Sequence, residues 1–349
     1  MANLPATYTT DTQTIDLVPS FRLAQTYGPV SLLSNYGYLD ADWRWKSSRN
    51  TFSVGGEWHH DSTYYDQFEQ ADLLGHDLGR LEESANVSWD RALTERADLT
   101  LAGSWDRVAY SQNATSTVSN YQYSQASLQY ARDLSENMQL TSTVGYGRFQ
   151  LLDNTYVSDE RFAQIGLQRS LSERWNLQAQ AGYADLTARG LSYSCCELAI
   201  APDGQLYYEP IPVTVYSGRG APNFAVVGQY KGERLQYTLS ASRVIQPSGL
   251  GALITEDNVG VDASFAGTER LSLGAGLHWA RISDLLGRLN LENQRYYNLS
   301  VTANWLWTEK WTLQLQSLYS QQYTTSKIPP AHGVTVYLSL LRQLGHLTL

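Results

Sequence analysis

A short turn motif recurs along the chain, each time between two segments in which apolar and polar residues alternate. Its copies are Leu93-Thr94-Glu95-Arg96, Leu134-Ser135-Glu136-Asn137, Leu171-Ser172-Glu173-Arg174, Gly267-Thr268-Glu269-Arg270 and Thr308-Glu309-Lys310, and equivalent positions are occupied by Ser47-Ser48-Arg49-Asn50 and Lys231-Gly232-Glu233-Arg234. The connections in between are longer and rich in Gly, Ser, Asn and Tyr. Short turns at one end of a meander and long loops at the other predict an all-β fold, a transmembrane antiparallel up-and-down β-barrel of the bacterial outer membrane.

The alternation is clear in the segment that precedes the first such turn. Leu39, Ala41, Trp43 and Trp45 fall on one face of a strand, and Asp40, Asp42, Arg44 and Lys46 fall on the other, because side chains of a strand alternate between its faces. Counting such segments gives 16 strands, from about 15–24 to 334–340. We expect the last strand to pair with the first and close the barrel. A count of 18 stays open if the segment 189–221 contains a further hairpin.

This count divides the chain into a periplasmic N-terminal segment at 1–14, a barrel at 15–343 and a C-terminal tail at 344–349. Eight external loops are expected, at about 25–31, 61–81, 111–119, 151–158, 189–221, 247–256, 283–292 and 324–332. The longest, 189–221, is our candidate for a loop that folds inward and gates a pore. Its candidate gating residues are Tyr193, Cys195, Cys196, Tyr207, Tyr208 and Tyr216. The adjacent cysteines could form a strained vicinal disulfide, pair between chains or have no role.

Composition narrows the class further. The 24 Tyr and 10 Trp against 7 Phe favour membrane interfaces, where amphipathic aromatic side chains gather. No run of 18 apolar residues is present, which excludes a transmembrane helix. The net charge of -9 argues against a nucleic-acid partner, since phosphate groups require a basic surface.

A barrel of 16 strands is wide enough to enclose an aqueous channel, so its inward residues are the candidate functional surface. Amides and hydroxyls predominate among them and suit hydrogen bonding to sugars, while the scattered charges would select weakly. The candidate lumen-lining residues are Asp42, Arg44, Glu57, His59, Asp90, Asp106, Gln178, Gln180, Gln229, Asp262, His278, Asn304 and Gln314.

The sequence predicts no enzyme, no cofactor and no metal site. None of the six His residues has a nucleophile at a recognisable spacing. His59, His60 and Asp61 could bind a metal ion only if neighbouring strand residues pointed to one face, and they do not.

The Leu-Ser-Glu-Arg-Trp style of turn at 171–175, its continuation through Asn176 to Ala179, and the passage from Ala241 to Gly251 resemble the outer-membrane barrels found with exopolysaccharide biosynthesis systems. The similarity covers most of residues 35–343. It implies a channel for a secreted polysaccharide that works with a periplasmic polysaccharide-export protein and lies among outer-membrane lipid and lipopolysaccharide. Two alternatives stay open, a diffusion porin for small solutes and a scaffolding barrel around a periplasmic partner.

Overall fold

The chain forms one large β-sheet. The structure is a computed structural model, and it describes residues 2–3, 5–26, 32–62, 79–111, 118–200, 206–285, 294–308, 310–323, 331–342 and 347–348. Nineteen strands belong to the sheet, and every pairing is antiparallel except that of β19 with β2. Within these residues there is no helix long and apolar enough to cross a membrane.

The strands fall into one long meander and three short terminal pieces. Their bounds are β1 (Ala2–Asn3), β2 (Ala6–Thr9), β3 (Gln13–Thr26), β4 (Leu32–Lys46), β5 (Asn50–Ser62), β6 (Gly79–Thr94), β7 (Ala97–Tyr110), β8 (Tyr121–Ser135), β9 (Met138–Leu151), β10 (Tyr156–Ser170), β11 (Trp175–Ile200), β12 (Leu206–Lys231), β13 (Leu235–Ser248), β14 (Ala252–Ala266), β15 (Leu271–Asp284), β16 (Gln294–Thr308), β17 (Trp311–Tyr323), β18 (Ala331–Arg342) and β19 (Leu347–Thr348). The 16 consecutive strands β3 to β18 confirm the count expected from the sequence.

The seven short turns join the strands where the motif predicts them, and the structure explains the motif. Its Ser or Thr hydroxyl accepts a hydrogen bond from the backbone N–H two residues later. The distance is 3.2 Å from Arg96 N to Thr94 Oγ1 and 3.3 Å from Arg174 N to Ser172 Oγ. Arg270 and Thr268 repeat the same contact at 3.2 Å. The hydroxyl thus fixes a tight turn locally, which is why Ser or Thr recurs at this position.

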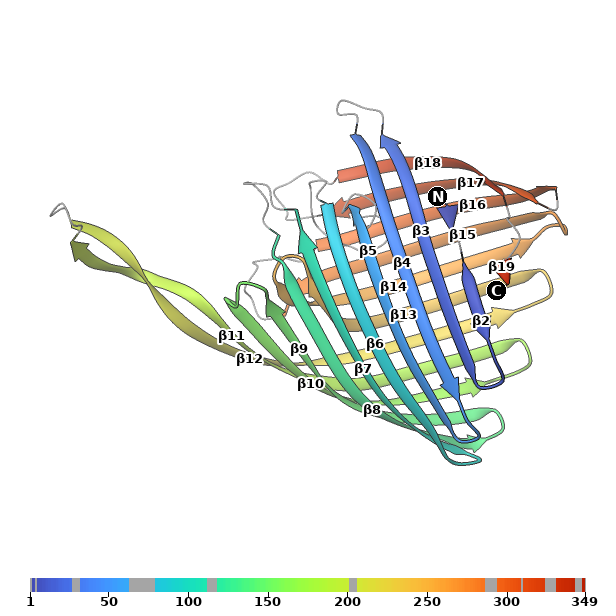
Figure 1. Cartoon of the computed structure of the whole chain (residues 1–349), viewed down its shortest axis with the longest axis horizontal. Coiled ribbons are helices and arrows are strands. Elements are labelled where there is room, and N and C mark those ends of the chain that lie inside the picture. Colours follow the sequence, from blue (N-terminus) through green and yellow to red (C-terminus); the bar gives the residue numbers. More distant parts are fainter. Residues whose placement is uncertain are drawn as a thin grey trace.

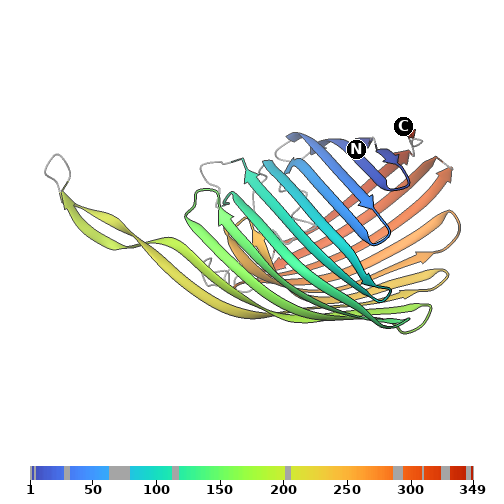
Figure 2. The ribbon, with the colours of Figure 1, turned by 60° about the horizontal axis from the view of Figure 1, so that its bottom comes forward.

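The sheet curls around on itself, so that β3 to β7 lie across from β13 to β18 (Figures 1 and 2). One face of every long strand carries the large apolar side chains that the alternation places outward. These side chains stay 40 to 63% exposed at Leu39, Leu128 and Ile165. A continuous apolar surface of this kind on a folded chain is the face that a bilayer covers.

Closure of the barrel differs from the expectation that the last long strand pairs with the first. The N-terminal segment turns back at residues 10–12, and β2 and β1 pair with the outer edge of β3. The chain end then reaches β2 through β19, which pairs with it in parallel. Both chain ends lie at this seam in Figure 1. The reason is local, since a hairpin to the adjacent strand closes a far shorter loop than a return from residue 342.

Residues 189–200 and 206–221 form strand rather than a gating loop, which corrects our expectation. They are the distal parts of β11 and β12, which are 26 residues long each and pair with each other along nearly their whole length. The resulting hairpin extends beyond the rest of the sheet (Figure 1) and is not an additional hairpin that would raise the count to 18.

The prolines of this segment, which favoured a loop, are compatible with its position at an edge. β12 pairs with β13 only from Phe224 to Lys231, so its residues before Phe224 have a free edge on that side. Pro210, Pro212 and Pro222 are separated by even numbers of residues, so their nitrogens all face the same edge. A residue without an N–H is tolerated in a strand where no hydrogen bond is required of it.

The expected external loop at 247–256 is also strand, apart from a tight turn at 249–251. β13 continues to Ser248 and β14 begins at Ala252, and Gly251 has a φ of 86°, which an L residue rarely adopts. Beyond the pair Arg243–Asp257 this hairpin separates from β12 and folds into the barrel. We call residues 244–256 the inward hairpin.

Candidate functional site: the barrel lumen

The predicted lumen residues share one face of the sheet. In the strand register Asp42 is opposite Gly55, and Glu57 and Asp106 both lie opposite Ser84. Followed from strand to strand, the register places all thirteen candidates on the same face of the sheet. Those in the second half of the chain are Gln178, Gln180, Gln229, Asp262, His278, Asn304 and Gln314. Arg44, His59 and Asp90 lie on this face as well. It is the face opposite to the exposed apolar surface.

The lumen wall formed by β4 to β7 is rich in carboxylates. His59 Nε2 lies 2.9 Å from Asp40 Oδ1, and Asp90 Oδ1 accepts a 2.6 Å hydrogen bond from Thr100. Toward the long-loop end Asp61 accepts two hydrogen bonds from Arg80, at 3.0 and 2.9 Å, and both side chains are buried. This buried ion pair fixes β5 to β6.

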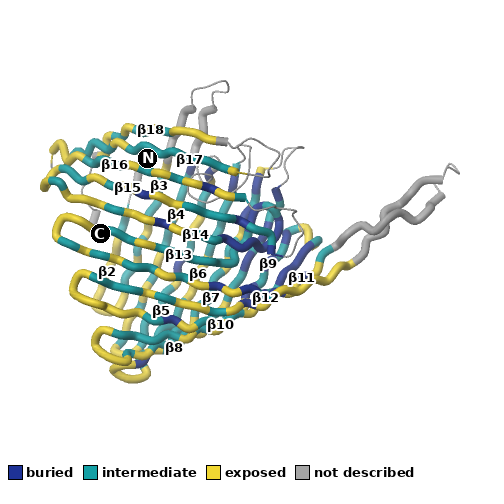
Figure 3. The backbone as a smooth tube through the Cα atoms, turned by 180° about the vertical axis from the view of Figure 1, so that it is seen from behind, coloured by how far each residue is buried: buried dark blue, intermediate teal, exposed yellow. Residues whose placement is uncertain are grey.

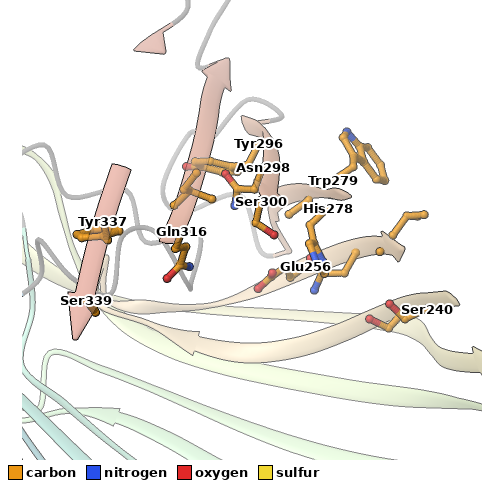
Figure 4. Close-up of a pocket in the computed structure, with 16 residues that line it drawn as sticks. Ser240, Glu256, His278, Trp279, Tyr296, Asn298, Ser300, Gln316, Tyr337 and Ser339 are labelled. Atoms are coloured by element: carbon orange, nitrogen blue, oxygen red, sulfur yellow. The ribbon is translucent and has the colours of Figure 1, made fainter. Parts of the chain in front are cut away.

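The wall formed by β13 to β18 is mostly uncharged. Serine, asparagine and glutamine side chains line a cavity of about 750 Å³ there, together with the carboxyl group of Glu256 and the imidazole of His278. Figure 4 shows Asn298, Ser300 and Gln316 around this space, together with Tyr296 and Tyr337. Gly260 leaves room for the His278 ring. A Cβ added at residue 260 would lie only 2.8 Å from His278 Nδ1. The two walls therefore differ in charge.

The inward hairpin narrows the lumen at the long-loop end. Leu253 and Ala252 are fully buried in one apolar cluster with Tyr110, Phe149 and Leu186. These partners come from the inner face of β7, β9 and β11. Within the cluster the ring centroids of Phe149 and Tyr121 are 5.3 Å apart. Buried segments, dark blue in Figure 3, gather in this part of the barrel around β9, β11 and β12. An apolar core of this kind inside a barrel constricts the water-filled path.

The tip of the inward hairpin is fixed by its backbone. Ser119 N donates a 2.8 Å hydrogen bond to Gly249 O, and Gly251 N donates one of 3.0 Å to Ser248 O. A Cβ on Gly249 would lie 2.4 Å from Tyr110 Oη, so a larger residue here would require the Tyr110 ring to shift. At the base of the hairpin, Arg243 and Asp257 form a bidentate ion pair of 2.5 and 2.9 Å.

Both faces of the inward hairpin are covered by protein. Leu253 and Thr255 lie on the face that farther along β14 carries Val259 and Val261, which are 46% and 41% exposed. Leu253 is 0% exposed because the hairpin sits inside the neighbouring wall. On the opposite face Ile254 packs on Ile282 and Tyr296. The hairpin thus forms a second layer within the barrel.

Sequence reasoning did not find this hairpin, although a signal was present. Ala252, Leu253 and Ile254 are consecutive apolar residues, where a strand between lipid and water would alternate. A continuous apolar run is typical of a strand that is buried on both faces. Gly249 and Gly251 suggested a flexible loop and concealed this pattern.

The residues expected to form the gate lie elsewhere. Tyr216 is on β12 and 76% exposed. Cys195 and Cys196 lie in β11 where the ladder with β12 shifts register between Ser194 and Glu197. The side chains of Tyr193, Cys195, Cys196, Tyr207 and Tyr208 lie outside the described residues.

Comparison with known proteins relates the fold to solved structures. No protein-family model matches the chain, and no curated sequence does. The ferric-catecholate import receptor Fiu from E. coli, in its open form, matches with a TM-score of 0.54 and 11% identity over 96% of this chain and 64% of its own. The ferric citrate transporter FecA gives 0.56 and 10% over 96% and 60%, and the copper transporter OprC gives 0.53 and 9% over 93% and 59%.

The chain spans less than two thirds of the length of these proteins, and at such low identity the likeness concerns the fold. Transmembrane barrels of this kind occupy the outer membrane, and the apolar outer surface agrees with that location. The chain therefore has the fold of an outer-membrane β-barrel, which confirms the bacterial outer membrane as its place.

Proposed function

We propose that this protein is an outer-membrane channel through which a polysaccharide leaves the cell, and that the inward hairpin closes the channel at rest. The single observation that carries the proposal is that one lumen combines a wall lined by amides and hydroxyls with the inward hairpin. Neutral polar side chains exchange hydrogen bonds with sugar hydroxyls at little cost, as a polymer that slides requires. The resemblance of the turn motifs to barrels of exopolysaccharide systems supports the same substrate class.

The charge of the opposite wall refines the substrate. Asp40, Asp42, Glu57, Asp90 and Asp106 face the lumen, with Arg44 among them. A wall of one predominant sign repels chains of the same sign. The polymer we propose is therefore uncharged or carries amino groups, rather than uronic acids or phosphates.

The constriction separates this proposal from a diffusion porin. A porin for small solutes keeps a permanently open lumen, whereas here an apolar cluster fills the space between the inward hairpin and β7 to β11. A polysaccharide exporter needs such closure between polymers, because an open channel would leak solutes. A periplasmic export protein is the partner that this function would require.

The test is conductance in planar bilayers. Val244 and Glu256 are direct partners across the hairpin, so replacing residues 245–255 with Asn-Gly joins them by a two-residue turn. We expect wild type to be mostly closed and the shortened protein to conduct steadily.

A second measurement tests the substrate. Deleting the gene in the native host should abolish release of surface polysaccharide, and wild-type protein should restore it. A wild type that conducts like the shortened protein would contradict the gate, and unchanged polysaccharide release would contradict the export function.

A further inference from the structure

The inner wall places one side chain of β4 beside two side chains of β5. Asp40 lies on β4, and Glu57 and His59 lie on β5. Their ligand atoms, one from each residue, all lie within 4.8 Å of one another. His59 Nε2 is 2.9 Å from Asp40 Oδ1 and 3.8 Å from Glu57 Oε2. We propose that these residues bind a divalent transition-metal ion in the lumen.

The distances suit a common ion. Ligand atoms about 2.0–2.2 Å from one metal ion stand about 3 Å apart at right angles and about 3.5 Å apart in a tetrahedron. The His59–Asp40 distance already meets the first value, and the 3.8 Å between His59 Nε2 and Glu57 Oε2 is close to the second. The exposed fractions of these side chains, 24% for His59, 40% for Asp40 and 50% for Glu57, leave the site open to lumen water.

The charge at the site favours a cation. In the described part of the chain, no Lys or Arg forms an ion pair with Asp40 or Glu57. Asp106 adds negative charge nearby on the lumen face. Ser84 of β6 lies between the two carboxylates, because it pairs with Glu57 of β5 on one side and with Asp106 of β7 on the other. Two neighbouring carboxylates repel each other unless a positive charge lies between them. A metal ion between them removes that repulsion.

The imidazole ring is held in position for this role. The ring of Tyr38 lies edge-on to His59, with 5.2 Å between ring centroids. One nitrogen and two carboxylate oxygens suit Zn²⁺, Co²⁺, Ni²⁺ or Fe²⁺, whereas Ca²⁺ and Mg²⁺ prefer oxygen alone. Three protein ligands leave further coordination positions for water or for a ligand that passes through the lumen.

The experiment is titration of the detergent-solubilised full chain with Co²⁺ or Zn²⁺, followed by calorimetry and by the visible absorption of bound Co²⁺. We expect one saturable site per chain. His59→Ala and Glu57→Gln should each weaken binding by about tenfold or more, the loss typical of disturbing a metal site. Ca²⁺ should not compete at equal concentration.

The barrel offers a matched control. His278 also lies in the lumen, with Nε2 2.9 Å from Asp262 Oδ1, but no third His, Cys, Asp or Glu among the described residues joins this pair. His278→Ala should leave the affinity for Co²⁺ unchanged. Heat-dependent gel migration and circular dichroism confirm that each barrel is folded, and Glu57→Gln serves if His59→Ala does not fold. Absent saturable binding, or an equal loss in His278→Ala, would overturn the site.

Discussion

At the scale of single residues, side-chain position relative to the strand decides the environment. Leu128 and Gln129 are neighbours on β8, yet Leu128 is 42% exposed on the apolar outer face, whereas Gln129 lies opposite Thr100 on the lumen face. The first meets hydrocarbon and the second meets water. Identical substitutions at the two positions therefore have different costs.

Leu128→Arg should lower the free energy of unfolding by about 2–4 kcal/mol, the cost of a charge facing lipid at mid-membrane. Gln129→Arg should change it by less than about 1 kcal/mol, because its charge stays in water. Urea unfolding in lipid vesicles measures both. Equal losses at the two positions would mean that Leu128 does not face lipid.

Leu253 tests the apolar cluster of the inward hairpin. Leu253→Ala removes a fully buried side chain, which costs about 2–5 kcal/mol in a packed core. We expect this loss to weaken the packing of the inward hairpin against β7, β9 and β11. Single-channel recordings should then show frequent openings. Val259→Ala, on the lipid-facing part of the same strand, is the control and should leave the channel closed.

At the scale of elements, the two long hairpins beside each other behave differently. β11 and β12 extend away from the rest of the sheet (Figure 1), whereas residues 244–256 of β13 and β14 pack in the apolar cluster with β7, β9 and β11. The cause is the end of the ladder between β12 and β13 at Phe224 and Arg243. Once this ladder ends, the two hairpins diverge: the inward hairpin buries Leu253, whereas Tyr216 on β12 stays 76% exposed.

Shortening the β11–β12 hairpin should leave closure intact. Gly190 and Val215 are direct partners, so residues 191–214 can be replaced by Asn-Gly without disturbing the lower ladder. The members of the apolar cluster that lie on β11 and β12 extend no farther than Ala188 and Ala221 among the described residues, and the shortened protein keeps both. We expect wild-type conductance and an unchanged unfolding midpoint. Steady conductance in this variant would show that the β11–β12 hairpin, and not the inward hairpin, closes the channel.

At the scale of the whole molecule, the lumen has one acidic wall and one neutral wall. Such a channel should favour cations over anions. In the protein shortened at the inward hairpin, which conducts, the reversal potential in a KCl gradient should give a K⁺/Cl⁻ permeability ratio above one. Asp42→Asn with Asp106→Asn should move that ratio toward one.

Glu233→Gln provides the control for this measurement. Its side chain is 91% exposed in a short turn outside the lumen, so the change removes one negative charge, half of what the double variant removes, without altering the lumen wall. An equal shift in the permeability ratio would show that net charge, and not the lumen wall, sets the selectivity.

The alternation of side chains and the hydroxyl of each turn motif are local properties, with contacts that span two or three residues. From them the sequence by itself determined the number of long strands, the seven short turns and the face on which residues such as Asp42 and Gln314 lie. A period of two needs no knowledge of distant partners.

Only the tertiary structure decided which hairpin enters the lumen, how the terminal strands form the seam, and that Asp40 of β4 meets Glu57 and His59 of β5. Each depends on where a ladder ends or on strands from different parts of the chain. Leu253 is buried because β9 and β11 curve around it, and no pattern within residues 241–260 specifies that curvature. Packing across the lumen arises from the closed sheet as a whole, and alternation along one strand carries no information about it.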